Sequence, residues 1–504
     1  MPHVRALPAV CAAILVAGAA AQTAPTPQQI AARLTANDLK ADVSFLASDA
    51  LEGRGTPSRG LDIAAEFIAA QFRRAGLETA GDDGYFQTAP FANVTPNLEG
   101  LELIVQVGDL VIKADRGAMS VVDSGAVDLT NAPALKIAAS DMERLNALTP
   151  EQVRGKVLIL DYATSATPGR GGVRSPAALL ARLRPALVVV LAASPGGGRG
   201  AGSAAPVARL RDTSAVVTPT LAVWDEAIRK AIDNPGAPEA IISAHVAAPV
   251  VTPVKLRNVI GVLRGSDPVL KDTYVLITGH YDHLGIRGTG EGDHIFNGAN
   301  DDASGTASVI EIAHTLASFP SRPKRSIVFV ALFGEELGLV GSRYYAQHPV
   351  FPLAKTVADI NLEQVGRTDV DGASRVGVVN VTGYDYTTLP AELKKAGEAF
   401  DIQVLKDEKN SDPYFGRSDN QAFADAGVPA HTMSVGYMFP DYHGAGDEWP
   451  KIDYENMAKV DRTVALAILR VADSTVAPEW NAANPKTERY VKAHESLVGP
   501  AAAK

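Results

Sequence analysis

The sequence predicts an α/β fold in which a largely parallel, mixed sheet lies between helices. Short runs rich in apolar residues occupy 274–279, 326–333 and 357–362, and the run 326–333 is nearly all apolar. Segments with helical spacing of apolar residues, 304–318 and 336–346, separate these runs. Strands that are buried on both faces have continuous apolar sequences, and alternation of strands with helices is typical of parallel sheets. We therefore expect helices on both faces of the sheet.

The composition is that of a globular protein. The chain has 504 residues, of which 46% are hydrophobic and 21% charged, which places it outside the range of disordered chains. At roughly 150 residues per domain, this length allows about three domains. The formal net charge is -10 and no long basic cluster opposes it, so nucleic acid is not an expected partner.

The first 21 residues have the pattern of a secretory signal peptide. Arg5 precedes an uncharged stretch, 6–21, that ends in small residues before Gln22. The stretch is shorter than the ~20 apolar residues of a spanning helix, so we expect export to the periplasm or the medium without stable membrane insertion. Cys11, the only cysteine of the chain, lies in this segment. The mature chain would therefore have no disulfide, no Cys-ligated zinc and no Cys nucleophile.

A different pattern separates the opening helices from the main α/β region. Apolar residues recur at helical spacing over 39–46 and 61–72, and short alternating strands follow from Leu101. Gly108 and Asp109, between two such strands, are typical of a two-residue hairpin turn. The expected divisions are the signal peptide 1–21, an N-terminal part of the main domain 22–98, a β-rich insert 99–250, the main domain 251–475 and a polar, peripheral tail 476–504.

His280 and Asp282 directly follow the first apolar strand, in the sequence His-Tyr-Asp-His at 280–283. Residues i and i+2 of an extended chain share a face, so Asp282 can accept the ring proton of His280 and fix the tautomer that binds metal. The alternative is a surface turn with a local hydrogen bond.

Carboxylates lie at the start of the next helix and after the second and third strands. Asp301 and its neighbour precede the helix at 304–318, where capping of the helix is the alternative use. Glu335 and Glu336 follow the second strand, and Glu363 follows the third. At an effective dielectric of ~20, two carboxylates ~4 Å apart repel by about 4 kcal/mol unless a cation or a proton lies between them. A solvated helix start is the alternative for the glutamate pair.

His443 lies in a later loop that is rich in aromatic residues, where a packed or surface histidine is the alternative. The carboxyl ends of parallel strands face a common crevice, so we expect these polar side chains to meet there. Two histidines and three or four carboxylates, without sulfur, form a set of ligands suited to zinc.

Five motifs, in this order along the chain, resemble the co-catalytic di-zinc aminopeptidases, a family that includes the glutamate carboxypeptidases and the transferrin receptor. The resemblance is close over 258–473 and loose over 46–91, and it implies a fold of the zinc-exopeptidase type. The motifs are Gly-His-Tyr-Asp-His at 279–283, Gly-Ala-Asn-Asp-Asp-Ala-Ser-Gly at 298–305, Phe-Gly-Glu-Glu-Leu-Gly at 333–338, Asn-Leu-Glu-Gln-Val-Gly at 361–366 and Tyr-His-Gly-Ala-Gly-Asp-Glu at 442–448.

The resemblance implies two Zn²⁺ per chain, with one ligand residue from each of the five motifs. His280 would bind one zinc, His443 the other, and Asp301 would bridge the two. Glu336 would join His443, and Glu363 would join His280.

The resemblance also assigns residues to the chemistry around the metals. Glu335 matches the general base and Asp282 the residue that orients the first histidine, while Tyr442 would donate to the oxyanion. The pair Ser418-Asp419 would support the ligands. The family usually has aspartate where this chain has Glu363, so Asp359 and Asp369 are the substitute ligands in case the longer side chain does not reach.

The insert resembles a protease-associated domain in three apolar runs: 155–160, 188–191 and 217–223. Domains of that kind have no catalytic groups of their own and are taken to cover the cleft or to steer substrates.

The function implied by these resemblances is hydrolysis of N-terminal residues from peptides outside the cytoplasm. Three alternatives stay open. A glutamate-releasing carboxypeptidase would use Arg367 or Arg417 to hold a substrate carboxylate, a glutaminyl cyclase would normally hold one zinc, and a receptor-like binder would hold none. The sequence sets neither the preferred residue nor the oligomeric state.

Overall fold

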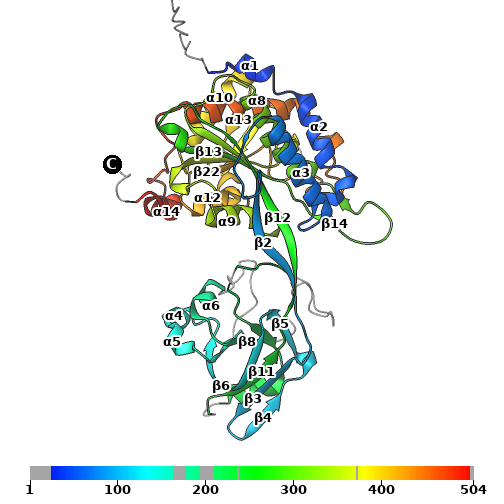
Figure 1. Cartoon of the computed structure of the whole chain (residues 1–504), viewed down its shortest axis with the longest axis vertical. Helices are drawn as coiled ribbons and strands as arrows, with labels where there is room; N and C mark the ends of the chain where they lie inside the picture. Colours follow the sequence, from blue (N-terminus) through cyan, green and yellow to red (C-terminus); the bar gives the residue numbers. More distant parts are fainter. Residues whose placement is uncertain are drawn as a thin grey trace, which may run out of the picture. The chain divides into compact units, whose positions relative to one another are not determined.

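A computed structural model describes residues 24–162, 177–192, 209–214, 216–234, 238–370 and 373–499 (Figure 1). The chain divides into two compact units, Met1–Thr88 with Arg257–Lys504, and Ala89–Leu256. The predicted signal peptide and Cys11 lie outside the described residues. Among the helices of the described part, none has the length and apolar character needed to cross a membrane.

The first unit is built on a mixed sheet with a parallel centre. Its neighbouring strands β22, β17, β13 and β16 run parallel, and β12 and β20 continue the sheet antiparallel on either side. Every residue of β13 and of β16 is buried, as expected for strands covered on both faces. The bounds are β12 (Val250–Leu263), β13 (Tyr274–His280), β16 (Ser326–Leu332), β17 (Thr356–Leu362), β20 (Val378–Val381), β21 (Gln403–Leu405) and β22 (Ala430–Ser434).

Helices cover both faces of this sheet, as the sequence predicts (Figure 1). On one side α2, α3, α8 and α13 pack together, and on the other α9, α12 and α14 do so. The bounds are α2 (Ala36–Leu46), α3 (Arg59–Arg74), α8 (Ser304–Ala317), α9 (Val340–Gln347), α10 (Leu389–Gly397), α12 (Asn420–Asp425), α13 (Tyr454–Asp473) and α14 (Glu488–Val498).

The longest of these helices, α13, shows how the sequence sets its limits. The carboxylate of Asp453 accepts the backbone N–H of Asn456 and caps the first turn. Met457, Val460 and Val464 are fully buried and stand at the three- and four-residue spacing of one helix face. The apolar face therefore packs into the domain, while the cap supplies an acceptor for a free amide at its start.

The second unit contains an 8-stranded sheet of order β4-β3-β11-β6-β7-β8-β10-β5. The predicted hairpin is present, with Val107 paired to Leu110 across Gly108 and Asp109. This unit begins at Ala89, ten residues before the expected boundary at 99, because β2 (Phe86–Thr95) pairs with β9 (Arg209–Asp212) inside it. The remaining bounds are β3 (Glu102–Val107), β4 (Leu110–Lys113), β5 (Met119–Asp123), β6 (Val127–Ala138), β7 (Val157–Asp161), β8 (Leu187–Leu191), β10 (Thr220–Val223) and β11 (Ile241–Val246).

The C-terminal segment differs in part from the predicted peripheral tail. Trp480 and Tyr490 stack at 5.0 Å between ring centroids and are both buried. They belong to the core cluster that includes Phe423 of α12. The segment is polar and mostly exposed or half-buried, as predicted, but its few aromatic residues supply a buried contact that anchors it.

A buried acidic pair between α2 and α8 makes the stability of the first unit depend on pH. Burial, with repulsion from Glu311 and a hydrogen bond to it, raises the pKa of Asp42 from 3.8 to about 8. Since the folded pKa lies above the unfolded one, the stability contributed by protonated Asp42 is complete below pH ~4 and is lost as the pH rises through about 8.

Asp42→Asn keeps a donor toward Glu311 but cannot ionise. We expect the variant to gain at least ~1 kcal/mol over the wild type between pH 5 and pH 8, measured as free energy of unfolding in urea. If the free energies of unfolding of the two proteins differ by the same amount at pH 5 and at pH 8, Asp42 does not titrate in this range.

Candidate metal centre

The first strand ends at a buried histidine whose two nitrogens have different surroundings. Nδ1 of His280 lies 3.1 Å from the backbone oxygen of Asp282 and 3.6 Å from its carboxylate. If Nδ1 donates to that carbonyl, Nε2 presents its lone pair toward Asp301, whose Oδ1 is 3.4 Å away. The nearest acceptor for Nδ1 is the carbonyl of Asp282, whereas the sequence pattern predicts its carboxylate.

The carboxylate of Asp282 links this histidine to the predicted base. Its Oδ1 accepts the backbone N–H of Glu335 at 3.1 Å, and its Oδ2 accepts the hydroxyl of Thr56 at 3.2 Å. Asp282 thus fixes the position of the turn that carries Glu335, as well as lying beside His280.

The two adjacent aspartates before α8 have separate uses. Asp302 accepts the backbone N–H groups of Gly305 and Gln364 at 3.0 and 3.1 Å, which is a capping role. Asp301 instead directs its carboxylate toward the strand ends. Its own N–H donates to the Asp447 carboxylate at 3.0 Å, which fixes the turn.

Asp301 lies between two histidines. Its Oδ1 is 3.4 Å from Nε2 of His280, and its Oδ2 is 3.2 Å from Nε2 of His443. Nε2 of His443 also lies 3.4 Å from Oε2 of Glu336. These four side chains come from four separate segments of the sequence, and the structure brings them together around the carboxylate of Asp301.

Glu363 follows β17 and faces His280 and Asp301. Ligand atoms of these three residues all lie within 4.8 Å of one another. The substitutes do not join this group: the buried Asp359 accepts the hydroxyl of Thr278 at 3.0 Å, and Asp369 pairs with Arg367. The extra methylene of Glu363 therefore does not keep it from the position that the resemblance implies.

The residues fit two metal ions. His283, Asp301 and Glu336 form a second group with ligand atoms within 4.8 Å. Ligands at ~2.0–2.1 Å from a tetrahedral zinc stand about 3.3 Å apart, close to the 3.2–3.4 Å separations between the histidine nitrogens and carboxylate oxygens. Nε2 of His280 and Oε2 of Glu363 are buried without a hydrogen-bond partner. Two cations that share Asp301 would satisfy these atoms.

The charges of the carboxylates also favour a bound cation at this site. Burial raises the pKa of Glu335 well above its usual value, with His280 opposing the rise and Glu363 adding to it. Burial, opposed by His280 and assisted by Asp301, raises the pKa of Glu363 to about 7. Carboxylates this close are costly to ionise together without a cation.

Arg54 is a residue that the sequence analysis missed. Its side chain is fully buried, and it donates to the backbone oxygens of Tyr281 at 2.8 Å, Asn297 at 2.7 Å and Gly298 at 2.9 Å. Burial lowers its pKa to about 10. It fixes the segments before Asp282 and before Asp301. The only sequence signal is a basic residue between two glycines at 53–55.

Tyr442 and the two arginines complete the predicted set. Tyr442 stacks on His443 at 4.0 Å between ring centroids, and burial raises its pKa, so its hydroxyl keeps its proton. Arg367 is bound by Asp369 at 2.6 Å and Asp441 at 2.9 Å, and Arg417 lies over the ring of Tyr414. Arg367 is therefore already neutralised by two carboxylates of the chain.

Of the predicted supporting pair, Ser418 contacts a predicted metal ligand, whereas Asp419 contacts Ser342. The hydroxyl of Ser418 hydrogen-bonds Glu363 and also accepts from the amide of Asn361 at 2.7 Å. The hydroxyl of Ser342 donates to the buried carboxylate of Asp419 at 2.5 Å.

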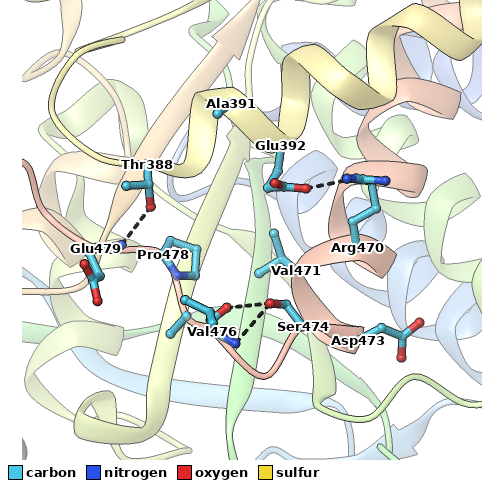
Figure 2. Close-up of a pocket in the computed structure, with 11 residues that line it drawn as sticks. Thr388, Ala391, Glu392, Arg470, Val471, Asp473, Ser474, Val476, Pro478 and Glu479 are labelled. Atoms are coloured by element: carbon cyan, nitrogen blue, oxygen red, sulfur yellow. Dashed lines mark hydrogen bonds and ion pairs between the residues drawn. The ribbon is translucent and has the colours of Figure 1, made fainter.

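A cavity of about 580 Å³ lies elsewhere, beside α10 and the end of α13 (Figure 2). The ion pair of Glu392 with Arg470, at 2.9 Å, and the turn from Ser474 to Val476 line it. None of the predicted metal ligands is among its lining residues. A smaller cavity, of about 320 Å³, borders the metal centre and is lined in part by Asp282, His283 and Glu336.

The structure is an α/β fold with nitrogen and oxygen side-chain groups gathered at the carboxyl ends of parallel strands, where folds of this class bind their ligands. Residues 258–468 match the model of peptidase family M28, so the chain carries a domain of that family.

The relatives cover only part of the chain. A probable zinc metalloprotease of Pyricularia oryzae is 38% identical over 130 residues, which is 26% of this chain and 24% of that protein. Aminopeptidase YwaD of Bacillus subtilis is 28% identical over 232 residues, 44% of this chain and 46% of that protein. A probable glutamate carboxypeptidase of Arabidopsis thaliana is 27% identical over 244 residues, 44% and 33% of the two. The matched stretch thus spans less than half of each relative's length.

Among solved structures, an aminopeptidase from Aneurinibacillus sp. strain AM-1 superposes with a TM-score of 0.49 at 20% identity, covering 89% of this chain and 96% of the other. The zinc aminopeptidase BSAP of Bacillus subtilis gives a TM-score of 0.46 at 19% identity, covering 88% and 96%.

Asp282→Asn tests the orienting role of this carboxylate. We expect zinc affinity on the His280 side to fall ~10–100-fold, because the variant loses the negative charge beside Nδ1 without losing a ligand. Competition with a chromophoric chelator measures this affinity. Asp293→Asn, an exposed aspartate with only a local turn contact, is the matched control. Equal affinities in the two variants would make Asp282 a bystander.

Glu363→Ala should selectively remove the metal held by His280, while Glu363→Asp should keep both metals. The shorter Asp sits nearer its strand but retains an oxygen ligand. Metal content after dialysis is the readout, and Asp359→Asn, which alters a buried carboxylate of the same strand, is the control. If Glu363→Ala keeps two metals and the Asp359 variant loses one, the ligand assignment must move to Asp359.

Proposed function

We propose that this protein is an exported two-zinc aminopeptidase that releases N-terminal residues from peptides. The observation that carries this proposal is the position of Asp301, whose two oxygens each approach a different histidine. A carboxylate in this position could contact two metals at once, and two-metal sites of this kind catalyse hydrolysis. The M28 domain and its relatives named as aminopeptidases support the same reaction class.

The metals would be held by His280, Asp301 and Glu363 on one side and by Asp301, Glu336 and His443 on the other. When bound, they supply a nucleophile at neutral pH and polarise the scissile carbonyl.

Two residues of the chain would then transfer the proton and stabilise the oxyanion. Glu335 is held by its N–H bond to Asp282 and is placed to accept a proton from the nucleophile and return it to the leaving amine. Tyr442 keeps its hydroxyl proton because burial raises its pKa, so it can donate to the developing oxyanion.

The arginines that the sequence offers for holding a substrate carboxylate already have partners in the chain. Arg367 is paired with Asp369 and Asp441, and Arg417 lies over the ring of Tyr414. The glutamate carboxypeptidase alternative therefore has less support.

Substrates with and without a free amino group test this proposal. We expect the purified protein to hydrolyse aminoacyl anilides and short peptides, to lose activity when the same peptides are N-acetylated, and to release no C-terminal glutamate from acidic dipeptides. Activity on acetylated peptides with glutamate release would favour the carboxypeptidase. Glu335→Gln is the control for contaminating peptidases.

Export and the identity of the insert belong to this proposal. Cleavage after Ala21 would give a mature protein that starts at Gln22, which mass spectrometry of the exported protein tests directly. The unit Ala89–Leu256 is proposed to be a protease-associated domain because it is β-rich, and no metal-binding group occurs among its described residues.

A further inference from the structure

His283 is a buried histidine next to the metal centre to which neither the motif resemblance nor the proposed mechanism gives a role. Its side chain is 0% exposed, and neither ring nitrogen has a hydrogen-bond partner. A buried polar group without a partner costs about 1–3 kcal/mol, so natural proteins rarely leave one in place.

His283 and Glu336 are in close contact, but the angle between them is outside the range of a hydrogen bond. Nδ1 lies 2.8 Å from Oε1 of Glu336, yet the pair does not meet the geometry of a hydrogen bond, and Oε1 is also without a partner. His283, Glu336 and Asp301 have ligand atoms within 4.8 Å of one another. Lone pairs that converge in this way repel unless a cation lies between them.

The fold provides room for this ring at a specific place. The backbone N–H of His283 donates to the oxygen of Arg54 at 3.2 Å. Gly298 lies against the ring, where a Cβ would stand 2.4 Å from Cγ of His283. The ring of His443 meets it edge-on at 5.7 Å between centroids. These contacts turn the imidazole toward Asp301 and Glu336.

His431 shows the ordinary way in which this chain buries a histidine. It is also 0% exposed, but Nδ1 lies 2.7 Å from the oxygen of Thr382 and Nε2 lies 2.6 Å from the hydroxyl of Thr387. Both of its nitrogens are therefore satisfied by the protein. The contrast indicates that the partner of His283 is a group from outside the protein chain.

We propose that His283 is an additional ligand of the metal held by Asp301, Glu336 and His443. This inference rests on the two-zinc centre of the proposed function. It gives that metal two histidines, whereas the metal at His280 and Glu363 has one. Two imidazoles raise the preference of the site for zinc over hard cations such as Mg²⁺, which favour oxygen ligands. The cavity lined by Asp282, His283 and Glu336 gives the metal a route to this side.

The first test is the zinc affinity of the full mature chain, measured by competition with a chromophoric chelator. We expect His283→Ala to weaken one of the two zinc sites at least ~10-fold and to leave the other unchanged. His431→Gln removes an equally buried histidine and should leave both affinities unchanged. Unchanged affinities in His283→Ala would overturn the proposal and reduce His283 to a neighbour of Glu336.

X-ray absorption of the zinc-loaded wild type tests the proposal without any variant. Three imidazoles shared by two zinc ions are expected, against two imidazoles if His283 does not bind. A wild type that binds fewer than two zinc ions would contradict the proposed function itself. Two zinc ions with two imidazoles would contradict only the role of His283.

Discussion

Glu335→Gln should retain both metals and lower kcat by at least ~10²-fold, the scale expected when a general base is lost. The glutamine has nearly the same shape and leaves the backbone N–H bond to Asp282 in place, so the turn after β16 should not move. Only the capacity to accept a proton is removed. Steady-state kinetics on an aminoacyl anilide gives kcat, and the metal content of the same sample gives the number of metals retained.

Glu336→Gln is the matched comparison on the adjacent residue. It replaces a proposed ligand, so it should lose metal as well as activity. If Glu335→Gln keeps substantial activity, or if it loses metal as the Glu336 variant does, Glu335 is not the base.

Asp301→Asn should lower the zinc content from two ions to fewer than one per chain, and should reduce activity by more than the ~10²-fold expected at Glu335. Each Asp301 oxygen approaches a different histidine nitrogen, so loss of the shared carboxylate weakens both sites at once. A single-site ligand such as Glu363 should affect only one of them.

Asp302→Asn is the control for this prediction. The side chain accepts N–H bonds from Gly305 and Gln364, and an amide oxygen can accept them too. The variant should keep both zinc ions. Retention of two zinc ions in Asp301→Asn would refute the shared position of Asp301, since no remaining residue could replace both of its contacts.

The sheet and the polar residues at its strand ends could be predicted because their signals are local. Strands β13 and β16 are mostly apolar, β17 less so, and each has its polar residue at its end or within four residues after it. Parallel strands place their carboxyl ends at one edge, so order along the chain was enough to expect His280, Glu336 and Glu363 close together. Their proximity follows from topology and needs no knowledge of individual contacts.

Other features depend on contacts between distant parts of the chain and left no local signal. Arg54 reaches Tyr281 and Gly298 from a segment more than two hundred residues earlier in the sequence. In the motif that contains His283, the predicted metal ligand is His280. Only the burial of His283 and the missing hydrogen-bond partners of its ring nitrogens indicate a role for it. The C-terminal segment has a polar average composition that conceals the packing of Trp480 on Tyr490.

The central claim is that two metals share Asp301, and anomalous diffraction from crystals of the zinc-loaded chain tests it most directly. We predict two anomalous peaks at the zinc edge, one on either side of the Asp301 carboxylate, with His280 and Glu363 at the first and Glu336 and His443 at the second. A single peak, or peaks that do not contact Asp301, would contradict the account.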